Sequence, residues 1–283
     1  MKTRKSCSGL ALGLGVLAIA VGSASGGTIY QSGSAGTTYT DALGDQQGSA
    51  NLLRDLSSVT VSNDANNLYL TLDVNPGGNL ATGGAFNYII GITTGNPSAG
   101  GDTSASSTHG NAYGRSIAFD TSFGGMTDFI GVFGAGGSGS VASPYTSYGF
   151  NDYVYGTPGS TTPAGVWTKI NTVSSGQPMS SQPSTSTPNS ISLTVPLSDF
   201  GANLALTPGV TFDFDVFSTG TSGNQTAYDS LVTQTPIQSG TYSATYQVVD
   251  TVLDQYTMVP EPSALALAGL GAVCLMLSRR CRK

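Results

Sequence analysis

Two aspartates on one predicted strand have the residue types and spacing that best suit catalysis. Asp213 and Asp215 lie in residues 210–216, where apolar and polar residues alternate. A strand would place both carboxylates on one face, roughly 6–7 Å apart at the backbone, and paired carboxylates can cleave a glycosidic bond. The same alternation is typical of the solvated face of a half-buried strand, which is the interpretation we favour. A surface glycan hydrolase that uses these two aspartates is the alternative.

The rest of the sequence offers little for catalysis. His109 is the single histidine, and the chain has neither a Gly-x-Ser-x-Gly elbow nor a His-Glu-x-x-His motif. Residues 26–258 contain no glutamate, and Cys7, Cys274 and Cys281 all lie outside them. This region therefore has no thiol nucleophile, Cys-based zinc site or disulfide. We predict that the protein is not an enzyme.

Residues 26–258 are strongly acidic. They hold fifteen aspartates against Arg54, Arg115 and Lys169, a net charge of −12, whereas the whole chain carries −6. Such a surface repels the phosphates of nucleic acid, so we expect no nucleic-acid partner. Carboxylate and amide oxygens are the hard ligands that calcium prefers. The composition therefore suits a structural calcium ion, which is the one cofactor we expect.

The elements that must position these residues are short strands. Apolar side chains recur at every second position, and Asn, Asp, Gly and Pro fill the turns between the segments. One-sided burial of this kind predicts an all-β fold, an antiparallel β-sandwich. The expected strands are 57–61, 68–74, 86–92, 116–120, 128–133, 166–170, 191–195, 210–216 and 245–249.

Two parts of this pattern resemble the CBM9-like, DOMON-related β-sandwiches. The first is Asp-x-x-Gly-Asp at 41–45, followed by Asp-Leu at 55–56 and the strands up to residue 74; the second is 212–219 with Ala-Tyr-Asp-Ser at 227–230. The resemblance implies a jelly-roll type of sandwich. In such relatives acidic residues of these segments can hold calcium, and the matching positions here are Asp45, Asp55 and Asp229.

Aromatic residues are the candidates for glycan contact, because their rings stack on the apolar faces of sugars. Trp167 is the only tryptophan, and Tyr153 and Tyr155 belong to a tyrosine cluster in a Gly-, Ser- and Pro-rich region. We predict glycan contact at Trp167, Tyr153 and Tyr155. The alternative is an ordinary role for these residues in a sheet, where tyrosine and tryptophan are common.

The C-terminal segment is a localisation signal. Pro260, Glu261 and Pro262 precede an uncharged apolar run at 263–277, and a basic tail follows it. The run is short for a bilayer, but tilted or thinned lipid accommodates such a length, so we predict a transmembrane helix at 263–278. The positive-inside rule places the tail in the cytoplasm. Its basic residues are Arg279, Arg280, Arg282 and Lys283.

This arrangement resembles the PEP-CTERM sorting signal of exosortase substrates over residues 259–283. The resemblance implies that a membrane-embedded, exosortase-type sorting enzyme recognises the Pro-Glu-Pro motif, cuts near it and passes the protein on. The expected location is the cell envelope, with a C-terminal membrane anchor, and then the cell surface or an extracellular matrix. The expected partners are the sorting enzyme, the membrane and an exopolysaccharide.

The N-terminus agrees with export. A basic start, the apolar run 10–21 and small residues at 22–26 form a signal peptide at residues 1–25, with a short signal helix. Residues 26–258 are then one exported β-sandwich domain. Within it, 174–189 is expected to be a mobile surface loop, although its prolines also suit a domain linker. We predict an exported surface or matrix protein with a binding or structural role.

Overall fold

The computed structural model of the protein describes a β-rich fold. It covers residues 27–28, 36–47, 51–80, 86–97, 100–105, 116–134, 148–155, 167–170, 177–178, 186–200, 204–220, 226–233, 237–238 and 246–259. The helical elements described are two single 3-10 turns, η3 (Thr121–Phe123) and η5 (Leu197–Asp199). None of the described helices is long and apolar enough to cross a membrane.

The first of two antiparallel sheets has five strands in the order β1-β2-β3-β4-β11. The long hairpin of this sheet joins β3 and β4 through a turn in which Asp64 Oδ1 accepts the N–H groups of Asn66 and Asn67. This is the Asx chemistry that the sequence suggests for the segment. The strands are β1 (Gly27–Thr28), β2 (Thr37–Thr40), β3 (Leu56–Asn63), β4 (Asn67–Val74) and β11 (Ser190–Pro196).

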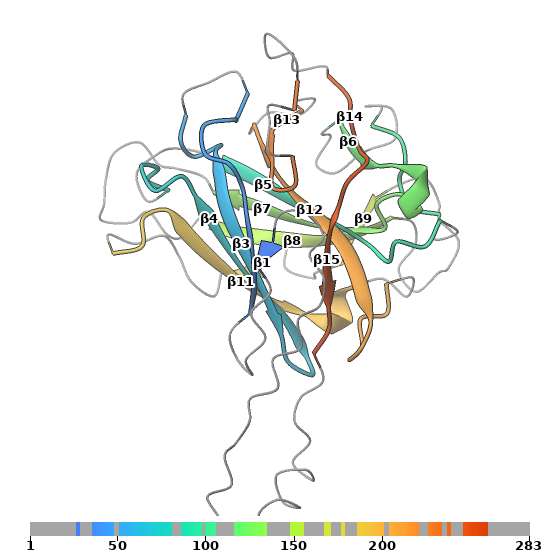
Figure 1. The fold of residues 1–283 in the computed structure, drawn as a ribbon. Coiled ribbons are helices and arrows are strands. Elements are labelled where there is room, and N and C mark those ends of the chain that lie inside the picture. The colour runs from blue at the N-terminus through green and yellow to red at the C-terminus, as the bar shows by residue number, and fades with distance from the viewer. Residues whose placement is uncertain are drawn as a thin grey trace, which may run out of the picture.

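The second sheet runs β10-β8-β7-β5-β12-β13, with β9 added beside β8 and β15 beside β12 (Figure 1). A separate parallel pair joins β6 to β14. The strands are β5 (Phe86–Thr93), β6 (Ile117–Phe119), β7 (Asp128–Gly134), β8 (Tyr148–Tyr155), β9 (Trp167–Lys169), β10 (Gln177–Pro178), β12 (Thr211–Thr219), β13 (Ala227–Ser230), β14 (Val248–Asp250) and β15 (Asp254–Thr257).

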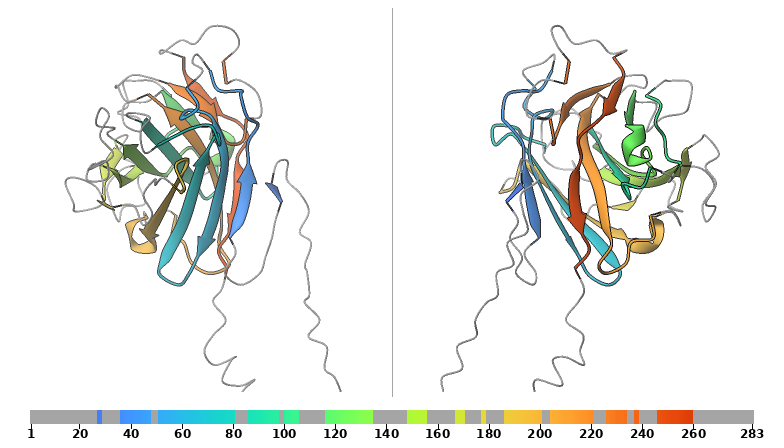
Figure 2. Two further views of the ribbon diagram at one scale, coloured as in Figure 1. Left: turned by 90° about the vertical axis from the view of Figure 1, so that its left-hand side faces the viewer. Right: turned by 45° about the vertical axis from the view of Figure 1, so that its right-hand side comes forward.

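The main apolar core lies between the two sheets, which Figure 2 shows as two layers. Burial alternates strictly along β4, so that Leu70 and Leu72 face inward. Across the core, the ring of Tyr39 meets that of Phe214 edge to face, with centroids 4.9 Å apart. Fully burying one such side chain contributes about 1.5–3 kcal/mol. This shared core holds the two sheets together.

The structure confirms the β-rich, antiparallel character of the fold, and each of the nine expected strands has a counterpart. It adds strands that the alternation does not reveal, among them β8 and β13. The β6–β14 pair is parallel, unlike the rest. The finer likeness to a jelly-roll or CBM9-like sandwich stays a prediction. The signal helix at 1–25 and the transmembrane helix at 263–278 lie outside the described residues.

The segment expected to be a loop, 174–189, lies only partly within the described residues. Its residues Gln177–Pro178 form β10, which pairs with β8. Its last residues, 186–189, lead into β11, where the N–H of Val74 donates to the carbonyl of Asn189. These two pieces tie the ends of the segment to different sheets.

The prediction that Asp213 and Asp215 lie on a solvated face of β12 is wrong. Asp213 is 4% exposed and Asp215 is fully buried. A second apolar cluster lies on this side of the eight-stranded sheet, and its residues Phe119 and Met126 pack against Gly91, the register partner of Asp215 on β5. Phe217, two residues beyond Asp215, belongs to this cluster together with Phe119 and Met126. Single-strand alternation cannot report such a layer, because its residues come from distant segments.

Candidate functional site

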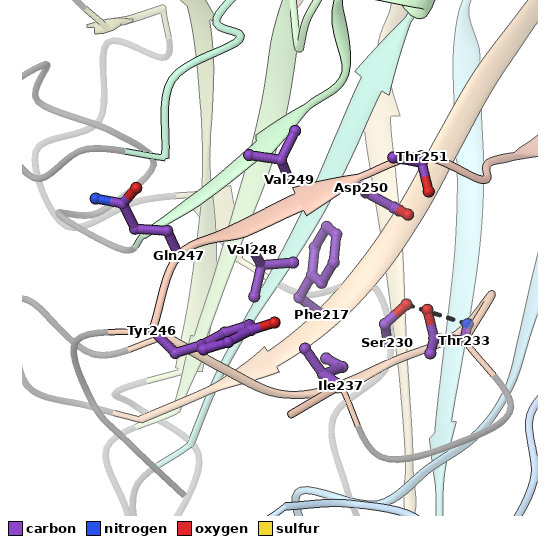
Figure 3. A pocket seen from close by; sticks show the side chains of 10 residues that line it. All are labelled: Phe217, Ser230, Thr233, Ile237, Tyr246, Gln247, Val248, Val249, Asp250 and Thr251. Carbon is purple, nitrogen blue, oxygen red and sulfur yellow. Dashed lines mark hydrogen bonds between the residues drawn. The ribbon is translucent and has the colours of Figure 1, made fainter. Parts of the chain in front are cut away.

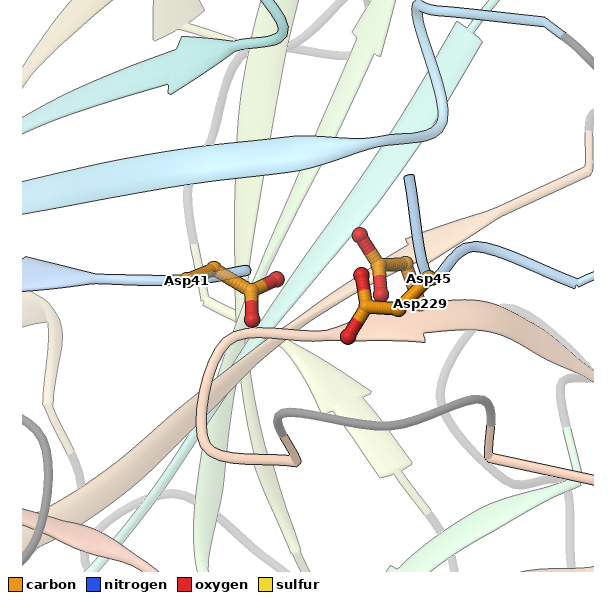
Figure 4. A group of neighbouring side chains, drawn as sticks. All are labelled: Asp41, Asp45 and Asp229. Atoms are coloured by element: carbon orange, nitrogen blue, oxygen red, sulfur yellow. The ribbon is translucent and has the colours of Figure 1, made fainter. Parts of the chain in front are cut away.

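Three carboxylates meet where the ends of the two sheets come together. Asp41 directly follows β2, Asp45 lies four residues later in the same loop, and Asp229 is on β13 of the other sheet. Ligand oxygens of these three side chains lie within 4.8 Å of one another. Figure 4 shows the carboxylates of Asp45 and Asp229 next to each other, with that of Asp41 across from them. We call these residues the carboxylate cluster.

A fourth aspartate shapes the loop that carries Asp41 and Asp45. The N–H of Gly44 donates to both oxygens of buried Asp55, at 3.0 and 3.1 Å, and Nδ2 of Asn75 donates to its Oδ2 at 2.5 Å. Gly44 has a φ of +88°, in the left-handed region that favours glycine. Asp55 therefore fixes the turn that directs Asp45 toward the cluster.

Other hydrogen bonds join this loop to β13. The N–H of Gln47 donates to the carbonyl of Tyr228 at 2.7 Å, and the N–H of Leu56 donates to Oδ2 of Asp229 at the same distance. The guanidinium of Arg54 stacks on the Tyr228 ring, 3.8 Å from its centroid. The cluster is thus built from both sheets and held in place by neighbouring backbone.

Burial and mutual repulsion make this cluster unfavourable when it is ionised. Burial, followed by the charges of Asp229 and Asp45, raises the pKa of Asp41 to about 10. Burial also raises the pKa of Asp229 to about 8, with repulsion from Asp45 and Asp55 adding to it. Burial raises the pKa of Asp45 as well. An ionised cluster therefore needs a compensating positive charge.

Asp45 is the member of the cluster whose carboxylate oxygens lack hydrogen-bond donors from other described residues. It is 9% exposed, and neither of its buried carboxylate oxygens accepts a hydrogen bond from any other described residue. Buried carboxylate oxygens are normally hydrogen-bonded or bound to a metal ion. The side chain therefore lies where a ligand would complete its interactions.

The geometry of the cluster suits calcium. Calcium binds oxygen ligands at about 2.3–2.6 Å, so ligands on opposite sides of the ion lie about 4.6–5.2 Å apart. The separations in the cluster, all within 4.8 Å, fall inside that limit. An ion held here would join β13 of one sheet to the loop after β2 of the other, and it would neutralise the repulsion.

The structure distributes the predicted metal ligands over two roles. It brings Asp45 and Asp229 together, and it places Asp55 beside them, hydrogen-bonded to Gly44 and Asn75. Asp41 completes the cluster and was missed as a ligand by sequence reasoning. Its position in Asp-x-x-Gly-Asp, directly after a strand, is the signal that could have identified it.

The predicted glycan-contact residues lie on neighbouring strands. Trp167 of β9 is the register partner of Tyr155 on β8, and Tyr153 pairs with Lys169. The indole Nε1 of Trp167 donates to Oδ2 of Asp102 at 3.2 Å, and its ring meets Phe129 edge to face, 4.8 Å between centroids. These contacts hold Trp167 within the sheet, as its ordinary packing role would require.

Asp213 and Asp215 are held by hydrogen bonds below the surface. Nε2 of Gln255 donates to Oδ1 of Asp213 at 2.7 Å. Asp215 Oδ2 accepts the hydroxyl of Ser230 at 2.6 Å, and its Oδ1 accepts the N–H groups of Val216 and Val232 at 2.6 and 3.2 Å. Both carboxylates thus have donors supplied by the protein.

Asp215 also interacts with a second buried carboxyl group. Burial raises its pKa well above the ordinary value, and the neighbouring carboxylate of Asp250 raises it further. Burial likewise raises the pKa of Asp250, while the hydrogen bond from Asp215 lowers it. These effects favour a pair in which Asp215 carries the proton and donates to ionised Asp250.

The predicted sorting residues Pro260, Glu261 and Pro262, and the basic tail at 279–283, lie outside the described residues. Comparison with known families nevertheless identifies this segment: residues 259–283 match the family described as the PEP-CTERM protein-sorting motif. No curated protein and no solved structure matches the chain. The chain therefore carries a PEP-CTERM sorting motif, which marks an exported, envelope-associated protein sorted by its C-terminal signal.

Proposed function

We propose that the protein is a calcium-stabilised, non-catalytic binding or structural element of the cell surface or extracellular matrix. The observation that carries the calcium assignment is the carboxylate cluster, in which Asp45 has two buried oxygens without a donor from another described residue. The sorting motif supplies the location. A calcium ion in the cluster would fix the two sheets relative to each other after export.

A non-catalytic role is supported by the surroundings of Asp213 and Asp215. A hydrolase that cleaves a polymer needs an acid and a base that reach the scissile bond. These two aspartates are buried, and their oxygens accept hydrogen bonds from the protein. The alternative, a glycan hydrolase built on this pair, loses the exposed strand face on which it depended.

The proposed partners follow from the C-terminal sorting signal. The PEP-CTERM motif is associated with exosortase-type processing. We place the apolar segment 263–278 in the membrane before processing, and an exopolysaccharide beside the released domain. Replacing Glu261 should leave the protein unprocessed in the membrane fraction. Normal release of that variant would contradict a role for the motif in sorting.

Thermal melting of the full chain in detergent tests the calcium assignment. At a calcium concentration about 100 times Kd, binding adds about 2.7 kcal/mol to stability, which raises Tm by roughly 5–11 °C for a domain of this size. Asp45→Asn should abolish this increase. Asp199→Asn on η5 makes the same chemical change outside the cluster and should retain it. An equal Tm in calcium and in chelator would reject the site.

A further inference from the structure

A second feature of the domain is a cavity of about 290 Å³ beside β14. The segment 246–251, which contains β14, forms one wall, and residues of β12 and β13 form the opposite side. Figure 3 shows Tyr246 at one side of the cavity, with Ser230 and Thr233 at the other. Ligand pockets in proteins span about 300–1,000 Å³. This cavity is at the small end of that range and suits one monosaccharide-sized group.

The described walls of the cavity combine apolar and hydroxyl-binding groups. Phe217, Ile237 and Val248 provide apolar surface, whereas Ser230, Thr233 and Thr251 carry hydroxyls. Tyr246 is 44% exposed, so its ring is accessible from solvent. Rings of this kind cover the apolar faces of sugars, and a few well-placed polar groups fix their orientation.

Asp250 is the polar group best placed to bind a hydroxyl. It is 7% exposed, its Oδ1 accepts the N–H of Val252 at 3.2 Å, and its Oδ2 is closed to solvent. The carboxyl of Asp215 can donate to it when protonated. A carboxylate oxygen has two lone pairs, so Oδ1 retains capacity for a ligand hydroxyl beside the Val252 N–H.

The charge of the site restricts the ligand further. None of the described lining residues is basic, and Asp250 contributes a carboxylate. A phosphate, sulfate or carboxylate group would be repelled there, because none of these described lining residues carries a compensating positive charge. A ligand with several neutral hydroxyls and an apolar face satisfies both kinds of wall.

We propose that this cavity binds one neutral sugar residue, which Asp250 holds through its hydroxyls and which the ring of Tyr246 covers. Because one residue fills the cavity, the ligand is a chain end or branch of a polysaccharide. This inference deepens the proposed binding role and rests on it. It assigns glycan recognition to residues around β14 and not to the predicted residues Trp167, Tyr153 and Tyr155.

Ligand-observed NMR with the full chain in detergent tests this site. Glucose, galactose and mannose serve as neutral probes, and glucuronic acid is the charged counterpart of glucose. We expect at least one neutral probe to bind in the millimolar range, without binding of glucuronic acid. Failure of all three neutral probes, or equal binding of glucose and glucuronic acid, would overturn the proposal.

Variants then locate the binding. Tyr246→Ala changes an exposed side chain and should weaken the best neutral probe about tenfold or more, and Asp250→Asn should do the same. Asp199→Asn should bind like the unmodified protein. If Asp250→Asn does not fold, Tyr246→Ala decides alone, and unchanged affinity in it would overturn the site. The calcium-dependent Tm is measured separately, so loss of the cation site and loss of the sugar site remain distinguishable.

Discussion

Two groups of buried aspartates in this domain differ in whether the protein itself supplies hydrogen-bond donors to their carboxylate oxygens. Asp215 accepts one hydroxyl and two N–H groups from neighbouring residues. Asp45 is also buried, at 9% exposed, but no other described residue donates to its carboxylate oxygens. The first arrangement satisfies a carboxylate within the protein, whereas the second requires something from outside. Burial of an acidic residue alone is therefore no sign of a site; burial without donors is.

The largest expected effect comes from removing the side chain of Asp215, which is hydrogen-bonded within the protein. Asp215→Ala leaves the Ser230 hydroxyl and the Val216 and Val232 N–H groups without their acceptor. Unsatisfied buried groups cost about 1–3 kcal/mol each, so the unfolding free energy should fall by about 3–5 kcal/mol. Chemical denaturation in calcium and in chelator should show the same loss. A loss confined to one condition would mean that the two groups are coupled.

Asp45→Asn should act in the opposite direction when calcium is removed. Without the ion, an amide in this position relieves the repulsion that Asp45 exerts on Asp41 and Asp229. The variant should therefore melt a few degrees higher than the unmodified protein in chelator at pH 8, and lower in saturating calcium. Destabilisation in both conditions would show that Asp45 has a partner in the folded protein.

The pH dependence of stability should differ with and without calcium. The pKa of Asp229 is raised to about 8 and that of Asp41 to about 10, from an ordinary value of 3.8. The folded state then binds more protons than the unfolded state between pH 4 and 10, so without calcium stability falls as pH rises through this range. Calcium favours the ionised form, and its stabilising effect should grow with pH. Melting curves at pH 5, 7 and 9 measure both trends; a calcium effect that shrinks toward pH 9 would contradict them.

A smaller effect is expected from the turn that directs Asp45. Gly44→Ala places a side chain at a φ of +88°, which costs roughly 1–2 kcal/mol in the left-handed region. A Cβ at this position has no neighbour within 4 Å, so the cost is conformational and not steric. Calcium affinity should fall about five- to thirtyfold, as titration calorimetry would show. Unchanged affinity would mean that the turn is not preorganised by Gly44.

The β strands could be predicted from the sequence because a strand with one buried face shows alternating apolar and polar residues. The alternation in residues 68–74 and 86–92 is a local consequence of one buried face, and β4 and β5 appear there. The burial of Asp213 and Asp215 was not predictable, because the second apolar cluster on this side of the sheet comes from β6, Met126 and other distant segments. The alternation of residues thus predicted the strands, whereas the second apolar cluster determines which strand faces are buried.

The candidate site, like the fold, could be predicted only in part from the sequence. Asp45 and Asp229 were identified from a family resemblance, although 184 positions separate them in the chain. Which neighbouring aspartates join them depends on backbone geometry: Asp55 turns toward the Gly44 N–H, whereas Asp41 faces the cluster. No spacing rule separates these two residues. The sorting motif needed no fold at all, because its signal is a contiguous sequence.

We propose that the carboxylate cluster holds one calcium ion between the two sheets. Equilibrium dialysis at pH 8, with the bound metal quantified by elemental analysis, measures this directly for the full chain and for Asp45→Asn. We predict one calcium ion per chain in the unmodified protein and in the control Asp199→Asn, with none retained by Asp45→Asn at the same free calcium. Equal calcium binding by Asp45→Asn, or no bound calcium in the unmodified protein, would contradict the account.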